Sequence, residues 1–101
     1  MVIIVFRSRL KKNADIPGLV RLGSAIYQTA TRMPGYVSYK DFTAEDGENV
    51  SIVEFESAET LRAWREHPDH LDAQRRGREE FFESYRIQVC TPGRSYSFPD
   101  P

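Results

Sequence analysis

Two histidines stand close together in the second half of the chain and are the residues best suited to proton transfer. His67 and His70 are three positions apart, and Trp64 precedes His67 by the same spacing. Histidine changes charge between about pH 5 and 8, so it can act as a general base near neutrality. We therefore treat His67 and His70 as candidate catalytic residues. The competing interpretation is structural: His67 precedes Pro68 and can cap a helical segment, and His70 can lie on a solvated face.

Other polar and aromatic side chains can hold a ligand without reacting with it. Hydroxyl, amide and guanidinium groups donate hydrogen bonds, and an indole ring offers a flat apolar surface. The candidate binding residues are Ser8, Tyr27, Tyr39, Trp64, Gln74 and Arg78. Trp64 is also explained as a core anchor, because tryptophan buries a large apolar area. Glu79 and Glu80 follow the basic run that ends at Arg78, which is typical of a solvated helix face with paired charges.

The sequence lacks the spacing patterns of metal and nucleotide sites. Cys90, the single cysteine, lies about twenty positions beyond His70, whereas structural zinc sites use closely spaced ligands. We expect Cys90 to be a buried structural thiol, and we expect no metal site. The chain contains no phosphate-binding glycine loop, no nucleophile elbow and no dinucleotide fingerprint. These enzyme classes are therefore excluded.

Length and charge restrict the partners of this chain. Its 14 basic and 15 acidic residues give a net charge of -1, which creates no field that would attract nucleic acid or an anionic membrane. Too few apolar residues precede Arg7 for a signal peptide or a membrane span. We expect a cytoplasmic protein that binds neither nucleic acid nor membrane. A chain of 101 residues has room for one core, which we assign to a domain over residues 1–94 followed by a C-terminal tail over residues 95–101.

The hydrophobic patterns predict four strands and two helical regions. The expected strands are residues 2–10, 36–43, 49–56 and 85–91. Asp46 and Gly47 supply the positive φ angles of a tight turn between the middle two strands. A first helix begins after the N-cap Asp15 and ends at the Met33-Pro34-Gly35 turn. Ser57 begins the second helical region without a full capping box, and Pro68 divides that region into residues 58–66 and 68–82.

This order of elements is the βαββαβ plan of a ferredoxin-like α+β fold. Right-handed crossovers put both helices on one face of a four-stranded antiparallel sheet, so the other face has no cover. On the first strand, that face must carry either Ile3 and Val5 or Ile4 and Phe6. On the third strand, it must carry either Val50 and Ile52 or Val53 and Phe55. Leaving about six such side chains in water forfeits on the order of 10 kcal/mol. We therefore expect a homodimer that packs sheet against sheet.

Two stretches of the chain resemble the antibiotic biosynthesis monooxygenase family. The run that begins Met33-Pro-Gly-Tyr-Val-Ser resembles the segment that opens the second strand of that family. The run from Ser51 to His70, SIVEFESAETLRAWREHPDH, resembles the stretch that links its third strand to its second helix. The resemblance covers residues 2–91 and implies a dimeric α/β-barrel fold.

The resemblance implies a cofactor-independent monooxygenase. Such an enzyme oxidises a small aromatic, quinol or polyketide-like substrate, whose anion reduces dioxygen, and the protein supplies a base, hydrogen-bond donors and a dry apolar pocket. His67 and His70 would then supply the base, and the six binding residues would surround a substrate between the sheet and the helices near Trp64. The alternative is a non-catalytic or stress-response dimer that holds a hydrophobic ligand in the same pocket.

A heme-degrading branch of the family gives a third and less favoured interpretation. That branch uses an asparagine on the first strand, a tryptophan on the second helix and a histidine ten residues later. The corresponding positions here are Ser8, Trp64 and Gln74. Glutamine is not among the usual axial ligands of heme iron. We therefore predict that the protein uses no cofactor.

Overall fold

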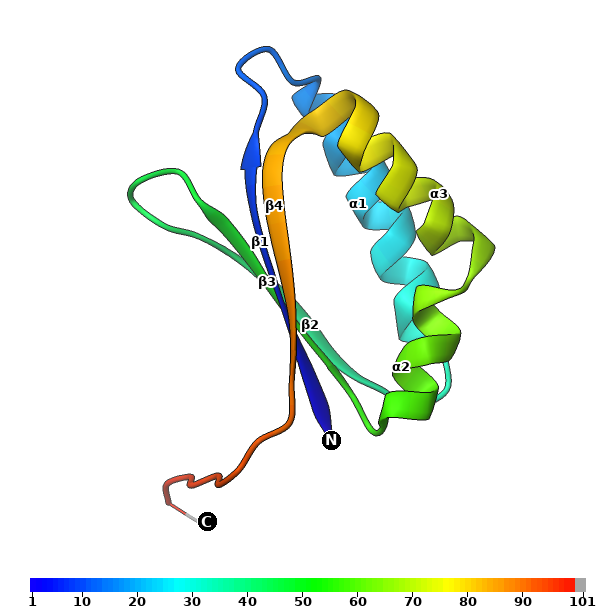
Figure 1. Cartoon of the computed structure of the whole chain (residues 1–101), viewed down its shortest axis with the longest axis vertical. Coiled ribbons are helices and arrows are strands. Elements are labelled where there is room, and N and C mark those ends of the chain that lie inside the picture. Colours follow the sequence, from blue (N-terminus) through cyan, green and yellow to red (C-terminus); the bar gives the residue numbers. More distant parts are fainter. Residues whose placement is uncertain (100–101) are drawn as a thin grey trace.

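The helices of this protein lie on one side of a single sheet (Figure 1). The structure is a computed structural model that describes residues 1–99, so residues 100–101 of the predicted tail lie outside the described residues. The elements in chain order are β1 (Val2–Leu10), α1 (Ile16–Thr31), β2 (Tyr36–Thr43), β3 (Asn49–Phe55), α2 (Ala58–Arg65), α3 (Pro68–Arg76), the π-helical turn η1 (Gly77–Phe81) and β4 (Phe82–Cys90). The strands are antiparallel and follow the order β2-β3-β1-β4. The expected ferredoxin-like α+β fold is confirmed.

The register of the strands decides which side chains meet the helices. Ile4 lies opposite Val53 on β3 and opposite Val89 on β4, so these residues share one face. That face, called the inner face here, packs against the helices and contributes to the core. The buried core cluster consists of Val2, Ile26, Ala30, Val53, Phe55, Leu61 and Trp64.

The opposite side of the sheet, called the outer face here, has no cover from any element of residues 1–99 (Figure 1). Val5 lies opposite Ile52 in the middle of this face, and Ile52 remains 36% exposed. The sequence left open which pairs of residues lie on the uncovered face. The structure places Ile3 and Val5 of β1, and Val50 and Ile52 of β3, on this outer face. The outer face consists of Ile3, Val5, Arg7, Arg9, Ser38, Lys40, Phe42, Val50, Ile52, Glu54, Ser84, Arg86, Gln88 and Cys90.

Side-chain caps define where the helices begin. Asp15 Oδ1 accepts a hydrogen bond from the Gly18 amide at 3.1 Å, as predicted for the N-cap of α1. Ser57 and Thr60 form a complete capping box, so the prediction of an incomplete box was wrong. The Thr60 hydroxyl takes the place of the usual carboxylate or amide, because its Oγ1 also reaches the Ser57 amide, at 3.2 Å.

The chain enters β4 earlier than predicted. The expected helix over residues 68–82 ends as α3 at Arg76, and the wider turn η1 leads into β4 at Phe82 instead of residue 85. A Cβ on Gly77 would lie 2.7 Å from the Phe82 ring, so glycine allows this ring to pack against the turn. Phe82 can then pair with Leu10 beyond a register shift in β1.

Cys90 is not the buried thiol that its alternating surroundings predict. It is exposed at the end of β4 and lies opposite Ile3 on the outer face. The prediction was wrong because β4 is an edge strand whose outer side is uncovered. In the hairpin turn, Gly47 adopts a positive φ of 91°, whereas Asp46 does not, so only half of that prediction is correct.

Candidate functional site

Ser8 is a polar point on the inner face of β1. Its side chain is only 3% exposed, and its Oγ has no hydrogen-bond partner within residues 1–99. Buried hydroxyl groups in native proteins are nearly always hydrogen-bonded, and an unpaired one costs about 1–3 kcal/mol. The structure therefore places Ser8, as the sequence predicts, on the face of the sheet that meets the helices, with its hydroxyl unpaired among residues 1–99.

Tyr85 connects Ser8 to a second predicted residue. Tyr85 lies directly opposite Ser8 across the β1–β4 ladder. The Arg78 Nη1 atom donates a hydrogen bond to the Tyr85 hydroxyl at 3.4 Å. The Phe6 ring lies 5.4 Å from the Tyr85 ring and 5.4 Å from the Phe82 ring, which gives the polar groups an aromatic border. Sequence reasoning missed Tyr85, although pairing the first strand with the fourth would have placed it beside Ser8.

Three predicted residues form a row on α3 and η1. His70, Gln74 and Arg78 follow one another at spacings of four, which stacks their side chains along one side of a helix. His70 contacts the Trp64 ring, and Arg78 donates a hydrogen bond to Tyr85. Gln74 lies between them and is half-buried. The π-helical turn begins within this row, and such turns occur frequently at functional sites.

His70 is packed flat against Trp64. The ring centroids are 4.2 Å apart, the ring planes differ by 10°, and Trp64 is 3% exposed. The Nδ1 atom of His70 lies 3.2 Å from the Trp64 carbonyl oxygen. Burial lowers the pKa of His70 to about 4, although the hydrogen bond to the Trp64 carbonyl raises it in part, and the positive charge of Arg65 lowers it slightly further. His70 is therefore neutral at pH 7, and the interpretation that it lies on a solvated face is wrong.

His67 occupies a structural position at the start of α3. Its Nδ1 atom accepts a hydrogen bond from the Asp69 amide at 3.1 Å and so caps the helix. Its ring lies 6.3 Å from the Trp64 ring, farther than the His70 ring. The structural interpretation of His67 as a helix cap is confirmed, and this ring nitrogen is not available for proton transfer.

Tyr27 and Tyr39 form a separate cluster. Their ring centroids are 5.7 Å apart, with the edge of one ring directed at the face of the other. Burial raises the pKa of Tyr39 to about 12, and the nearby Asp41 carboxylate adds to this shift. Tyr39 belongs to β2, whereas Tyr85 belongs to β4 at the opposite edge of the sheet. The structure therefore does not bring these two predicted residues together with the group around Ser8.

The inner surface along β4 is apolar and only partly covered. Ile87 is 46% exposed and Val89 is 52% exposed, although both lie on the face that carries the helices. Leu71 of α3 is also half exposed. Ile87 follows Tyr85 by two positions on the same face of β4, so this apolar surface continues the strand beside the polar group.

The described residues offer no evident place for a metal. Among residues 1–99, no three His, Cys, Asp or Glu side chains gather into a group that could hold a metal ion. None of the described helices is long and apolar enough to cross a membrane.

The arrangement of sheet and helices is shared with solved structures of ferredoxin-like α+β proteins. Rv0793 from Mycobacterium tuberculosis superposes with a TM-score of 0.82 at 23% sequence identity, covering 95% of this chain and 98% of that one. SnoaB from Streptomyces nogalater, a cofactor-independent oxygenase, superposes with a TM-score of 0.79 at 16% identity, covering 98% and 97% of the two chains. These similarities establish the fold.

Sequence comparison identifies the family. The uncharacterized protein YqjZ of Bacillus subtilis (strain 168) is 24% identical over 89 residues, which are 88% of this chain and 78% of that protein. Residues 1–76 match the antibiotic biosynthesis monooxygenase family. The chain belongs to this family, as the resemblance in its sequence indicates.

Proposed function

We propose that this protein is a homodimeric, cofactor-independent monooxygenase that oxidises a small aromatic, quinol or polyketide-like substrate with dioxygen. Membership of the antibiotic biosynthesis monooxygenase family supports the class of reaction. The observation that carries the proposal is the buried Ser8 hydroxyl, which has no partner within residues 1–99 and lies opposite Tyr85 and its donor Arg78.

The polar group is suited to hold an oxyanion of the substrate. The substrate oxygen would lie near the hydroxyls of Ser8 and Tyr85, and the Arg78 guanidinium would balance its negative charge. Fixed donors are most effective where water is excluded, and of the three donors Ser8 is the one so buried, beside the aromatic border around Phe6. One oxygen atom of O2 then enters the substrate and the other leaves as water, with the two electrons and two protons supplied by the substrate itself.

We assign the base to His70 rather than to His67. His70 belongs to the row that leads to Arg78, and it is in its neutral, proton-accepting form at pH 7. The Nδ1 atom of His67 is occupied by the helix cap. A pKa of about 4 makes His70 a weak base, because general bases work best when their pKa lies near the operating pH. This weakness favours a second candidate function, a non-catalytic dimer that holds a hydrophobic ligand on the same surface.

The homodimer follows from the outer face. Val5, Ile52 and Phe42 lie on a face that no element of residues 1–99 covers, and Phe42 is 52% exposed. A second copy packed against this face would remove their apolar surface from water.

Oxygen consumption with a panel of dihydroxyaromatic compounds tests the function. We expect turnover to fall about 100-fold in Ser8→Ala, because a donor to the anion is lost. Ser84→Ala removes an exposed hydroxyl from the outer side of β4 and serves as the matched control. His70→Ala should lose turnover, whereas His67→Ala should keep it.

The same experiment separates the two candidate functions. Equal rates in wild type and Ser8→Ala would remove Ser8 from the site. No oxygen uptake with any compound, together with quenching of Trp64 fluorescence by the same compounds, would identify a ligand-holding protein. A shift of the Soret band on adding hemin would contradict the prediction that no heme is bound.

A further inference from the structure

The apolar side chains of the outer face follow a diagonal across the four strands. Phe42 on β2 lies opposite Val50 on β3, Ile52 lies opposite Val5 on β1, and Ile3 lies opposite Cys90 on β4. Within β3 the row moves by two residues, from Val50 to Ile52, and within β1 it moves by two residues toward the same end of the sheet, from Val5 to Ile3. The apolar diagonal is thus formed by Phe42, Val50, Ile52, Val5, Ile3 and Cys90.

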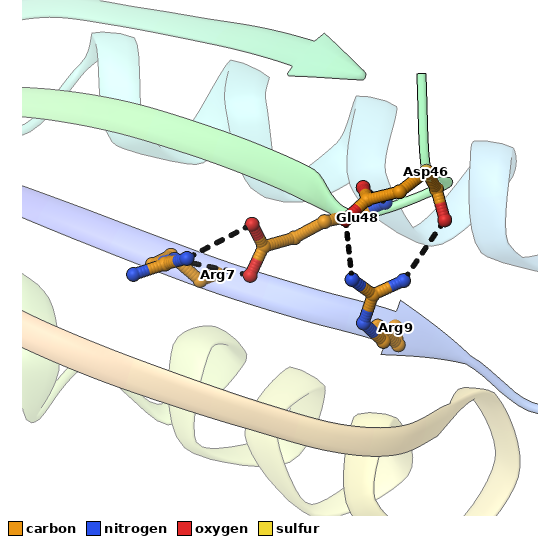
Figure 2. A network of polar contacts seen from close by, with 4 residues as sticks. All are labelled: Arg7, Arg9, Asp46 and Glu48. Atoms are coloured by element: carbon orange, nitrogen blue, oxygen red, sulfur yellow. Dashed lines mark hydrogen bonds and ion pairs between the residues drawn. The ribbon is translucent and has the colours of Figure 1, made fainter. Parts of the chain in front are cut away.

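One flank of the apolar diagonal is basic. Arg7 and Arg86 lie directly opposite each other across the β1–β4 ladder, an arrangement that is unfavourable for like charges. Figure 2 shows that Arg7 and Arg9 are held by the hairpin between β2 and β3. Arg7 forms two bonds of 3.0 Å to the Glu48 carboxylate, and Arg9 binds Asp46 at 2.9 Å.

Arg86 differs from its two basic neighbours. Its side chain is exposed and makes no ion pair or hydrogen bond with any of residues 1–99. The Arg7 guanidinium already holds the pKa of Glu48 below its ordinary value, so that carboxylate is engaged. A hollow of about 260 Å³ beside Arg86 is lined by Arg7, Ser8, Arg9, Glu48, Ser84, Tyr85 and Arg86. The basic flank therefore contains one uncompensated charge next to a hollow.

The other flank carries Glu54, which forms no ion pair within residues 1–99, although Lys40 lies on the same flank. Glu54 lies opposite Ile3 on one side and opposite Ser38 on the other. The Ser38 hydroxyl donates a hydrogen bond of 2.6 Å to Glu54, and within residues 1–99 no lysine or arginine forms an ion pair with this half-buried carboxylate. A second hollow, of about 190 Å³, is lined by Ser38, Lys40, Phe42, Ile52 and Glu54.

We propose that the twofold axis of the homodimer runs along the apolar diagonal, so that Arg86 of each protomer pairs with Glu54 of the other. The proposal rests on the homodimer of the proposed function. Half a turn about an axis along the diagonal exchanges its two flanks. The basic flank of one copy then covers the flank of the other copy that carries Glu54. The apolar side chains meet in the middle, where burial stabilises the complex most.

The charges exclude the other simple arrangement. An axis in the same plane but at right angles to the diagonal would place Arg86 against Arg86 and Glu54 against Glu54. Like charges brought together at an interface suppress association, whereas opposite charges fix its register. Of these two axes, only the one along the diagonal gives Arg86 and Glu54 each a partner of opposite sign.

A charge exchange measured by sedimentation equilibrium tests this arrangement. Arg86→Glu and Glu54→Arg should each raise the dimer Kd by at least about tenfold, because each creates two like-charge contacts. The variant with both substitutions should return to within about threefold of wild type, since its pairs are restored with reversed sign. Arg21→Glu, on an exposed position of α1, should leave the Kd unchanged.

The possible failures are distinguishable. A wild-type monomer at every concentration would overturn the homodimer of the proposed function and this arrangement together. If the wild type is a dimer, two results would overturn the arrangement alone. In one, neither single variant raises the dimer Kd; in the other, the double variant does not restore the Kd that the single variants raise. Arg86→Gln adds a further criterion: it weakens a dimer with the axis along the diagonal and tightens one in which Arg86 faces its own copy. Unfolding of a single variant cannot imitate recovery in the double variant.

Discussion

Gly35 lies so close to Thr60 that a Cβ on this glycine would be 2.4 Å from the Cβ of Thr60. Gly35 has a φ of 80° and forms the turn between α1 and β2, and Thr60 closes the capping box at the start of α2. The Gly35 carbonyl also accepts a hydrogen bond from the Glu56 amide at 2.8 Å. The turn after the first helix and the start of the second are therefore packed as one unit.

Replacing Gly35 with alanine should destabilise the protein strongly. The substitution adds the strain of a positive φ to a clash with Thr60, and we expect a loss of about 3 kcal/mol in the free energy of unfolding. Gly23→Ala is the control, because a Cβ there meets nothing within 4 Å in α1, and it should stabilise by about 0.5–1 kcal/mol. Urea denaturation measures both, and similar effects of the two changes would contradict this packing.

The buried ring of His70 should make stability depend on pH. As the pH falls, the unfolded chain protonates His70 near its ordinary pKa of 6.5, whereas the folded protein keeps it neutral until about pH 4. The unfolded state thus binds more protons in this window, so the free energy of unfolding should fall between about pH 6.5 and 4 and stay level above it. The loss attributable to His70 is at most about 3 kcal/mol.

Two variants isolate this contribution. His70→Phe keeps a flat ring against Trp64 but cannot titrate, so its stability should fall less steeply with acid than that of the wild type. His67→Gln should retain the wild-type slope, since the pH dependence is attributed to His70. Denaturation followed by Trp64 fluorescence from pH 4 to 8 measures the slopes, and parallel curves for wild type and His70→Phe would show that His70 titrates normally.

The strands and the single-sided helical cover could be predicted because they depend on local patterns. The alternation in residues 2–10 and 36–43 matches β1 and β2 at both ends. The faces of these strands were harder to assign. A register shift between Tyr36 and Ser38 turns Tyr36 toward Phe55, so the simple alternation that groups Tyr36 with Ser38 fails there. A bulge depends on the partner strand, which a local pattern does not contain.

The candidate site could be predicted only in part. Ser8 was found because its position on a strand fixes the face to which it points. Tyr85 was missed although it lies in the expected strand 85–91, because its place beside Ser8 depends on the register between β1 and β4. The roles of His67 and His70 could not be separated by spacing, because the contact with Trp64 that distinguishes them arises from a change of direction at Pro68.

Removing the Ser8 hydroxyl should increase stability. The hydroxyl is buried and unpaired within residues 1–99, so Ser8→Ala removes a desolvation cost and should raise the free energy of unfolding by about 1 kcal/mol. Ser51 is the matched control: it is 5% exposed, but its hydroxyl donates a hydrogen bond to Asp41. Ser51→Ala should therefore destabilise by about 1 kcal/mol. Guanidinium denaturation measures both, and destabilisation by Ser8→Ala would reveal a partner for its hydroxyl.

Cys90 provides a direct probe of the proposed dimer axis. It is the single cysteine, it is exposed, and it ends the apolar diagonal along which the axis is proposed to run. The two copies of Cys90 should then face each other across about 10 Å, the usual separation of packed sheets. A short bismaleimide should link them into a covalent dimer on a denaturing gel, and Cys90→Ser should abolish the product.

Moving the thiol along the same strand supplies the decisive control. Ser84 lies on the same face of β4 but opposite Arg9, well away from the diagonal. In a Cys90→Ser background, Ser84→Cys should cross-link poorly, because half a turn about the diagonal carries the two copies of this position far apart. Efficient cross-linking at position 84 and little at position 90 would place the axis elsewhere on the outer face, even if the protein sediments as a dimer.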